Sequence, residues 1–229
     1  MPKLLIVLTS HGTLGETGRR TGFYWEELAA PYWAFRDAGL DIALASIAGG
    51  EPPADPTSLP REGSAPPAVT RFLGDAEAMA ELRDTATLEG QRPEDLAGIF
   101  LPGGHGTMWD LPGSLPLAKL VGALFDAGKP VGAVCHGPAG LVGARRSDGR
   151  PVVEARRVNG FTDSEERAAG LAEVVPFLLE TRLRNLGAHF EGGPDFAPYA
   201  VRDGNLVTGQ NPASAEPAAK HMLELLRRE

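Results

Sequence analysis

The chain has 229 residues, 42% of them hydrophobic, a formal net charge of −8 and a pI near 5.2. This length and apolar content suffice for one sizeable core, so we expect a single domain over residues 1–229. The acidic balance argues against nucleic acid or an anionic membrane as a partner, because both select basic surfaces. No segment has the roughly 18 apolar residues of a membrane helix, and the N-terminal run is too short for a signal peptide, which indicates a cytoplasmic protein.

The N-terminal part of the chain reads as a strand followed by a helix. The run KLLIVLTS at 3–10 is apolar and turns polar at its end, which is typical of a strand buried on both faces. Between residues 21 and 38, aromatic and aliphatic side chains recur at helical spacing, which predicts a helix. Gly39 is its expected C-terminal cap, and Pro31 is expected to kink or break it.

The middle of the chain alternates between strand and helix patterns. A second strand is expected at 40–50, and the proline-rich segment 51–67 is expected to be a surface loop too polar to bury. We then expect a strand at 96–104, a helix at 114–129, a strand at 130–135 and a helix of small residues at 136–144. Such alternation through short loops is typical of βαβ units around a parallel sheet with right-handed crossovers.

The C-terminal part is expected to form a strand pair and a closing helix. The sequence YAVRDGNLVTGQ carries an Asp-Gly turn signal at 203–204 between two apolar runs. A final helix is expected from about Ser214 to Arg228, with small and aliphatic residues on its inner face.

The only cysteine of the chain, Cys135, lies where a predicted strand gives way to a predicted helix. Small residues stand two positions before and after it, Ala133 and Gly137, as a nucleophile elbow requires. Such a turn presents the side chain at a helix N-terminus, which favours the thiolate, so we expect a lowered pKa for Cys135. A buried, inert cysteine is the alternative. A single cysteine excludes an intramolecular disulfide.

Two further segments fit a site at the carboxyl ends of the strands, where ligands of open α/β sheets bind. FLPGGHGTMWDLP places Gly103 and Gly104 on a loop beside the elbow, so one of their amides together with the His136 amide would form an oxyanion hole. Turning the chain is the simpler role for these glycines. In TGFYWEELAAP, Glu26 and Glu27 open a helix, where solvated acids are also expected.

Three blocks carry a resemblance to a known family: TGFYWEELAAPYWAFRDAG, FLPGGHGTMWDL with AVCHGP, and VNGFTDSEE followed by VPFLLETRLRNLGAHF. Together they resemble the ThiJ/PfpI superfamily, which is related to the class I glutamine amidotransferase domains. Within it they are similar to the branch of holding chaperones and glutathione-independent glyoxalases. The resemblance implies a flavodoxin-like α/β fold in three layers, with a mostly parallel central sheet, a Cys-His-acid site and a homodimer.

By position, the resemblance makes Cys135 the nucleophile, His136 the histidine of the site and Glu27 the buried glutamate that hydrogen-bonds the thiol. An ionised carboxylate in contact with a thiolate would raise the pKa of both groups. We therefore expect Glu27 to be protonated and to donate its hydrogen bond to sulfur. The same donor would stabilise an oxidised sulfur, which makes Cys135 a candidate oxidation sensor as well.

The third acid of the site aligns with Glu166, while Glu165 and Asp163 remain alternatives. His105 is expected to line the pocket. A glutamine amidotransferase would take its base from a His-x-Glu pair near the chain end; AHFE at 188–191 has that spacing but reads as strand or loop. No histidine or acid cluster shows convincing metal-ligand spacing, so neither a metal nor a cofactor is expected.

These residues predict a cofactor-independent enzyme of the glyoxalase III type, which converts methylglyoxal or related dicarbonyls with water to 2-hydroxy acids such as lactate. The thiolate would add to the aldehyde carbon, and backbone amides would hold the oxyanion. His136 would then move a proton between the two carbons through an enediol, without any need for glutathione. Two alternatives remain open: a redox-regulated holding chaperone for unfolded client proteins, and a cysteine peptidase or amidase.

Overall fold

A computed structural model describes residues 2–59 and 65–227, so residues 60–64 of the proline-rich segment and Arg228 of the last helix lie outside the described residues. Within this part of the chain, a six-stranded sheet has the order β2-β1-β3-β4-β8-β7. Its strands are β1 (Lys3–Leu8), β2 (Ile42–Ser46), β3 (Leu96–Leu101), β4 (Val131–Val134), β7 (Ala200–Asp203) and β8 (Leu206–Gly209). Its neighbours pair in parallel except β7 with β8. A separate parallel pair joins β5 (Arg157–Val158) to β6 (His189–Phe190).

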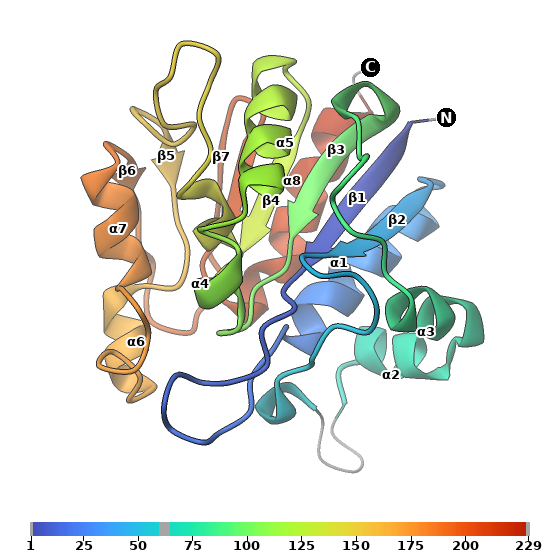
Figure 1. Ribbon diagram of the computed structural model, residues 1–229, viewed down its shortest axis with the longest axis horizontal. Coiled ribbons are helices and arrows are strands. Elements are labelled where there is room, and N and C mark those ends of the chain that lie inside the picture. Colours follow the sequence, from blue (N-terminus) through green and yellow to red (C-terminus); the bar gives the residue numbers. More distant parts are fainter. Residues whose placement is uncertain (1, 60–64, 228–229) are drawn as a thin grey trace.

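Helices cover both faces of the main sheet (Figure 1). They are α1 (Trp25–Asp37), α2 (Pro67–Gly74), α3 (Ala76–Arg83), α4 (Thr107–Asp110), α5 (Leu115–Asp126), α6 (Asp163–Ala168), α7 (Leu179–Asn185) and α8 (Ala215–Leu226). Short 3-10 turns are η1 (Pro56–Ser58), η2 (Pro93–Asp95), η3 (Gly137–Leu141) and η4 (Pro212–Ser214). The predicted α/β sandwich with a mostly parallel sheet is confirmed. Among the described helices, none is long and apolar enough to cross a membrane.

Alternate side chains of β1 enter two different cores. Leu4, Ile6 and Leu8 pack in the core that contains α1 and α8, whereas Leu5 and Val7 pack in the core that contains α5. Successive residues of a strand point to opposite faces, so a strand between two helical layers needs an unbroken apolar run. The run in β1 meets this requirement, and the strand lies inside the sheet, between β2 and β3.

The helix α1 ends as the sequence predicts but does not break at its proline. Gly39 has a φ of +82°, and its N–H donates to the Arg36 carbonyl at 2.9 Å, while the Leu40 N–H donates to the Phe35 carbonyl at 3.1 Å. These two bonds form a Schellman motif, in which glycine accepts the left-handed conformation without strain. The helix continues through Pro31, so the expectation of a break there is wrong.

The described part of the segment 51–67 is not the polar surface loop that its composition suggests. Asp55 and Ser58 are buried, because Asp55 accepts hydrogen bonds from the Thr21 hydroxyl at 2.8 Å and from the Thr57 N–H at 2.8 Å. A buried polar side chain is tolerated when its hydrogen bonds are made. These bonds tie the segment to the chain just before α1, next to the candidate site.

Several shorter elements differ from the sequence prediction. The helices α2 and α3 were not predicted, because eight residues give too little helical periodicity to stand out from a loop. The helix expected at 136–144 is only the 3-10 turn η3. The predicted strand pair forms as β7 and β8, with its turn at Gly204 and Asn205, one residue later than the Asp-Gly signal.

Candidate active site

Cys135 lies on the sharp turn between β4 and η3, at the carboxyl end of the strand. Its φ is +58°, a left-handed conformation that residues other than glycine rarely adopt and that is often found at functional sites. The Cys135 N–H donates to the Gly209 carbonyl at 2.9 Å, and the Phe161 N–H donates to the Cys135 carbonyl at 2.8 Å. These bonds to neighbouring segments hold the strained turn, which has the form of the predicted nucleophile elbow.

The glycines around the elbow leave no room for side chains. A Cβ on Gly137 would lie 2.1 Å from the Leu101 carbonyl oxygen. A Cβ on Gly103 would lie 2.6 Å from Glu27 Oε2 and 2.6 Å from the His136 backbone nitrogen. The sequence requirement for a small residue two positions after Cys135 therefore has a direct steric cause in the close approach of the β3 end.

Gly103→Ala is accordingly expected to displace the Glu27 carboxyl and the His136 amide. We expect the free energy of unfolding to fall by about 1–3 kcal/mol, as for other overpacked interiors, together with a loss of turnover. Denaturant unfolding and kinetics on one preparation measure both effects. Gly113→Ala is the matched control, because no atom lies within 4 Å of a Cβ at that position. Equal behaviour of the two variants would contradict the steric argument.

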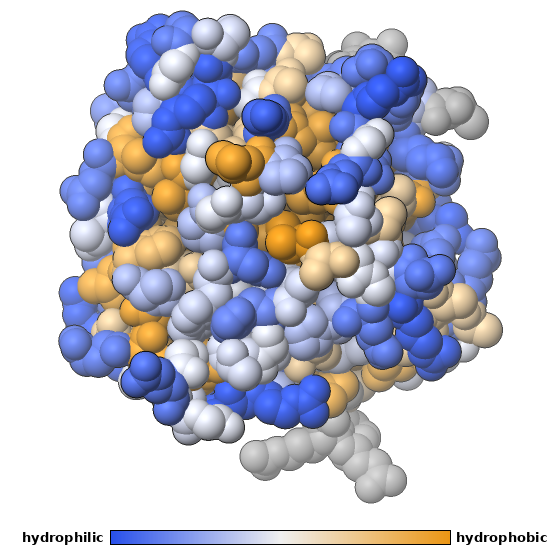
Figure 2. Space-filling view, viewed as in Figure 1, coloured by the Kyte–Doolittle hydropathy of each residue, from blue (hydrophilic) through white to orange (hydrophobic). Residues whose placement is uncertain are grey.

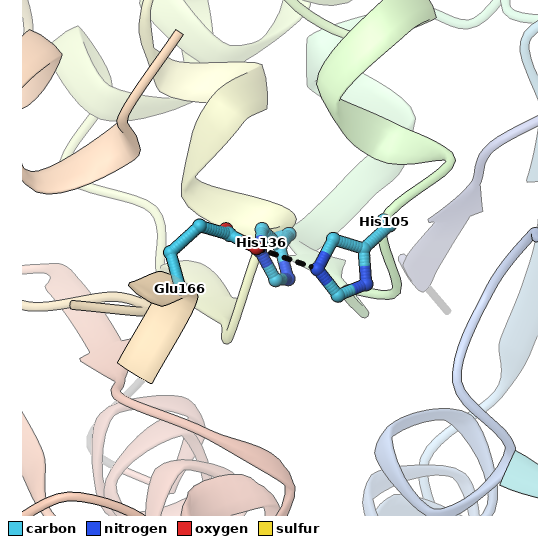
Figure 3. Close-up of side chains that lie close together, drawn as sticks. All are labelled: His105, His136 and Glu166. Atoms are coloured by element: carbon cyan, nitrogen blue, oxygen red, sulfur yellow. Dashed lines mark hydrogen bonds and ion pairs between the residues drawn. The ribbon is translucent and has the colours of Figure 1, made fainter. Parts of the chain in front are cut away.

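A hydrogen-bonded series of side chains starts at the buried sulfur. Cys135 Sγ lies 3.3 Å from His136 Nδ1, and His136 Nε2 lies 2.7 Å from Glu166 Oε2. His105 Nε2 lies 2.9 Å from the other carboxyl oxygen, Glu166 Oε1. Figure 3 shows the two imidazole rings beside the Glu166 carboxyl, each side chain coming from a different segment. Cys135, His136 and Glu166 are 4%, 1% and 2% exposed, so the series runs through the protein interior.

The three acids that the sequence left open separate clearly along α6. Glu166 directs its carboxyl to the His136 ring. Glu165 is fully buried and accepts the Phe196 N–H at 2.8 Å, which attaches a neighbouring loop to the helix. Asp163 accepts the Thr181 hydroxyl at the start of α7. Of these three, Glu166 is the acid that contacts the histidine next to the cysteine.

Glu27 lies in the first turn of α1 and is completely buried. Its Oε2 accepts the Gly103 N–H at 2.7 Å, whereas its buried Oε1 has no hydrogen-bond partner among the described residues. Burial raises the pKa of Glu27 to about 8, and the nearby Cys135 opposes the rise. A protonated Oε1 avoids a buried, unpaired negative charge, and its O–H is then available to the Cys135 sulfur. This agrees with the expectation of a neutral Glu27.

The raised pKa of Glu27 makes stability depend on pH. The folded chain binds this proton more tightly than the unfolded chain, so the stabilisation is complete below about pH 4.5 and is lost as the pH rises through about 8. Glu27→Gln keeps the shape and a hydrogen-bond donor but not the titration. We expect the free energy of unfolding to fall less in this variant than in the native protein between about pH 5 and about pH 9, as urea unfolding measures. Parallel pH profiles would contradict a neutral Glu27.

The expected lowering of the Cys135 pKa is wrong for the resting protein. Burial raises the pKa of the thiol, and the backbone N–H of His136 only partly opposes this rise. The turn that follows is a five-residue 3-10 helix rather than a full α-helix, so the dipole that would favour a thiolate is weak. The resting sulfur is therefore a neutral thiol that needs a base.

His136 and Glu166 are in the protonation states that supply this base. Burial, and then His105, lowers the pKa of His136, so its ring is neutral. Burial opposes the ionisation of Glu166, but His136 and His105 together outweigh it and lower the pKa of Glu166 to about 2. An ionised carboxylate can only accept hydrogen bonds, so the His136 nitrogen that faces it, Nε2, must carry the proton. Nδ1 is left free to accept the proton of the Cys135 thiol.

The structure narrows the choice of amides for the expected oxyanion site. The Gly103 N–H is occupied by Glu27 Oε2, so it is not available to a substrate. The remaining donors from the two expected segments are the Gly104 and His136 amides. Gly104 has a φ of +100°, and a Cβ there would lie 2.2 Å from the Gly22 carbonyl, so this loop conformation requires glycine.

Two aromatic residues of the site were not predicted from the sequence. The Phe161 ring lies 4.5 Å from the His136 ring, between centroids. Burial, and then Glu27 and Cys135, raises the pKa of the Tyr24 phenol to about 12, so the phenol responds to two groups of the site. Both residues lie inside the sequence blocks quoted above. From the sequence alone, however, an aromatic residue of a functional site cannot be distinguished from one that packs in the hydrophobic core.

The other candidates divide between the site and the surface. His189 is exposed on β6 and Glu191 binds Arg157, so the amidotransferase-like pair does not meet Cys135. His105, His136 and Glu166 bring ligand atoms within 4.8 Å of one another and form a group that could hold a metal ion. No spacing of residues along the chain predicts this group, because folding brings three separate segments together. A cation there would replace the two N–H protons that point to the carboxylate.

Comparisons with known proteins agree with this architecture. A family described as the DJ-1/PfpI family matches residues 21–225. The protein named glutathione-independent glyoxalase HSP31 of Saccharomyces cerevisiae is 30% identical over 234 residues, which cover 98% of each chain. The protein named glyoxalase 3 of Candida albicans is 29% identical over 97% of this chain and 98% of its own.

Solved structures give the same result at the level of the fold. The Rapid Encystment Protein 24 KDa of Francisella tularensis superimposes with a TM-score of 0.94 at 33% identity, over 99% of both chains. The crystal structure of glyoxalase III from Candida albicans superimposes with a TM-score of 0.90 at 28% identity, over 98% of this chain and 97% of that one. The family match extends over most of the sequence and includes Glu27, Cys135, His136 and Glu166. The chain belongs to the DJ-1/PfpI family.

Proposed function

We propose that the protein is a glutathione-independent glyoxalase of the glyoxalase III type, which converts methylglyoxal or related 2-oxoaldehydes with water to 2-hydroxy acids such as lactate. One observation carries the proposal: the single cysteine lies on an elbow, 3.3 Å from the Nδ1 of a histidine whose other nitrogen is fixed by a buried carboxylate. Full-length relatives named as glutathione-independent glyoxalases support the same reaction.

In this proposal the reaction starts from the neutral thiol. His136 Nδ1 takes the thiol proton as sulfur adds to the aldehyde carbon, and the Gly104 and His136 amides stabilise the oxyanion until it is protonated to a hemithioacetal. His136 then removes the hydrogen of that carbon and returns a proton to the adjacent carbon through an enediol. The resulting thioester is hydrolysed by one water molecule, which releases the 2-hydroxy acid and restores the thiol.

The neutral Glu27 suits this sequence of steps. An ionised carboxylate beside the sulfur would repel a thiolate, whereas the O–H of a protonated Glu27 stabilises it by donation. Glu166 keeps its charge and stabilises the imidazolium that forms on His136. The site thus holds one permanent negative charge next to the base and none next to the nucleophile.

The experiment that tests this function supplies methylglyoxal to the purified protein in buffer without glutathione. We expect lactate to accumulate over many turnovers, and glyoxal to give the corresponding 2-hydroxy acid, glycolate. A strict requirement for added glutathione would contradict the mechanism, because the protein thiol would then not be the nucleophile. Peptide and amide substrates in a parallel assay are expected to remain intact, since an amide is a harder target for this thiol than an aldehyde.

We further propose that the protein acts in the cytoplasm as a homodimer, without nucleic acid or membrane partners. The net charge of −8 supports the absence of polyanionic partners. A role in holding unfolded clients has less support, because the large hydrophobic residues that are exposed within residues 2–59 and 65–227 lie on four different segments: Leu59, Leu73, Leu115 and Phe196. Figure 2 shows hydrophobic residues interspersed with hydrophilic ones on the face that it draws.

A further inference from the structure

His105 contacts the same carboxylate as His136 but from the opposite oxygen. It lies on the loop between β3 and α4, and its Nε2 is 2.9 Å from Glu166 Oε1. Its ring centroid lies 4.1 Å from that of His136, with an angle of 41° between the planes. The His105 side chain is 17% exposed, whereas those of His136 and Glu166 are 1% and 3% exposed. His105 is therefore the outermost of these three side chains.

We propose that His105 is a positioning residue for the base of the reaction: its N–H holds the Glu166 carboxylate in the orientation in which the other oxygen accepts the His136 Nε2 proton. This inference rests on the proposed function for one point only, the identity of the reaction in which His136 acts as the base. Because Glu166 is ionised, both imidazoles donate to it, one to each oxygen. Two donors from two separate segments fix the carboxylate more tightly than one donor does.

The loss of this donor has a defined consequence. Without His105, Glu166 Oε1 would be a buried anionic oxygen with no partner, and such an atom is strongly unfavourable. The carboxylate would rotate toward His136 or take up a proton. Either change alters the orientation or the tautomer of His136, and with it the ability of Nδ1 to accept the proton of Cys135.

The chemistry also favours an imidazole over a lysine or arginine at position 105. During turnover His136 carries a positive charge, and the His105 ring lies 4.1 Å from it between centroids. A lysine or arginine at this position would offer N–H groups, but its fixed charge would oppose the imidazolium at short range. An imidazole donates to Glu166 through Nε2 without such a fixed charge.

The test compares His105→Phe, which removes the donor, with His105→Gln, which supplies a neutral N–H. We expect His105→Phe to lower kcat by about 10–100-fold, as for other groups that orient a first ligand or base, while KM changes by less than about threefold. His105→Gln is expected to recover most of the loss. His221→Phe is the matched control, because His221 lies on α8 away from the site.

A second measurement makes the inference independent of the substrate. The rate at which iodoacetamide alkylates Cys135, followed against pH without any dicarbonyl and with a chelator present, reports on the thiol and its base alone. We expect slower alkylation in His105→Phe and a rate close to native in His105→Gln, with both variants folded and only His105→Phe less stable to urea. If lactate does not form but these rates keep the expected order, the proposed function fails and the positioning role stands. Native rates in His105→Phe, or equal losses in both folded variants, would overturn the positioning role.

Discussion

Cys135→Ala is expected to lower kcat for methylglyoxal by about 10⁴-fold or more, which is the scale on which removal of a nucleophile acts. The mechanism forms a bond from sulfur to the aldehyde carbon, and no other thiol exists in the chain to replace it. Alanine fits the volume of this 4% exposed side chain, so the fold should persist. Lactate formation at saturating methylglyoxal measures the loss, and circular dichroism with thermal unfolding verifies that the variant is folded.

The same variant separates catalysis from chaperone activity. A holding chaperone binds unfolded clients through apolar surface, and Cys135 contributes almost none because it is buried. We therefore expect Cys135→Ala and the native protein to suppress the aggregation of a heat-denatured client to the same extent. Retained turnover in this variant would exclude Cys135 as the nucleophile, and a parallel loss of both activities from a folded variant would indicate that the two share one site.

Glu166→Gln is expected to produce the second large loss, about 10³–10⁴-fold in kcat, by analogy with the amide replacement of the acid in a serine protease triad. The amide has nearly the shape of the carboxylate, but one of its two ends is an NH₂ donor. That end would face an imidazole that also donates, so His136 or His105 must change tautomer or turn away. His136 then either has its proton on the nitrogen that faces sulfur or is misplaced.

The two neighbouring acids serve as matched controls for this prediction. Asp163→Asn is expected to keep kcat within about twofold, because Asp163 binds the start of α7 and not the imidazole. Glu165→Gln is expected to lower stability by about 1–3 kcal/mol through the loss of a buried acceptor, with smaller effects on kcat than Glu166→Gln. Kinetics and urea unfolding of the three variants together test the assignment. A larger kcat loss in either control than in Glu166→Gln would contradict it.

The parts of the fold that the sequence could predict are those with a local cause. The unbroken apolar run of β1 follows from burial on both faces, and Gly39 marks the end of α1 because the Schellman motif needs a left-handed residue. The elbow at Cys135 was predictable because the approach of the Leu101 carbonyl forbids a Cβ at Gly137. Each of these constraints limits the residue types that are allowed at a few consecutive positions, and this limit can be read directly from the sequence.

The parts that were missed depend on contacts between distant segments. Thr21 and Thr57 donate hydrogen bonds to the buried Asp55 carboxylate. The residues next to Asp55 in the sequence give no indication of the contact with Thr21, which is 34 positions away. The pKa of Cys135 was predicted in the wrong direction, since the direction of the shift depends on how deeply distant segments bury the sulfur. The contact of His105 with Glu166 joins residues separated by 61 positions, so no spacing rule could reveal it.

The most direct test of the account uses the unaltered protein and its single cysteine. Methylglyoxal turnover is followed while iodoacetamide reacts, and intact mass gives the number of alkyl groups per chain. We predict that turnover falls in proportion to alkylation, that it reaches the blank rate when one group is bound at Cys135, and that methylglyoxal slows the alkylation. Full turnover by protein whose Cys135 is completely alkylated would contradict the central claim that this thiol attacks the dicarbonyl.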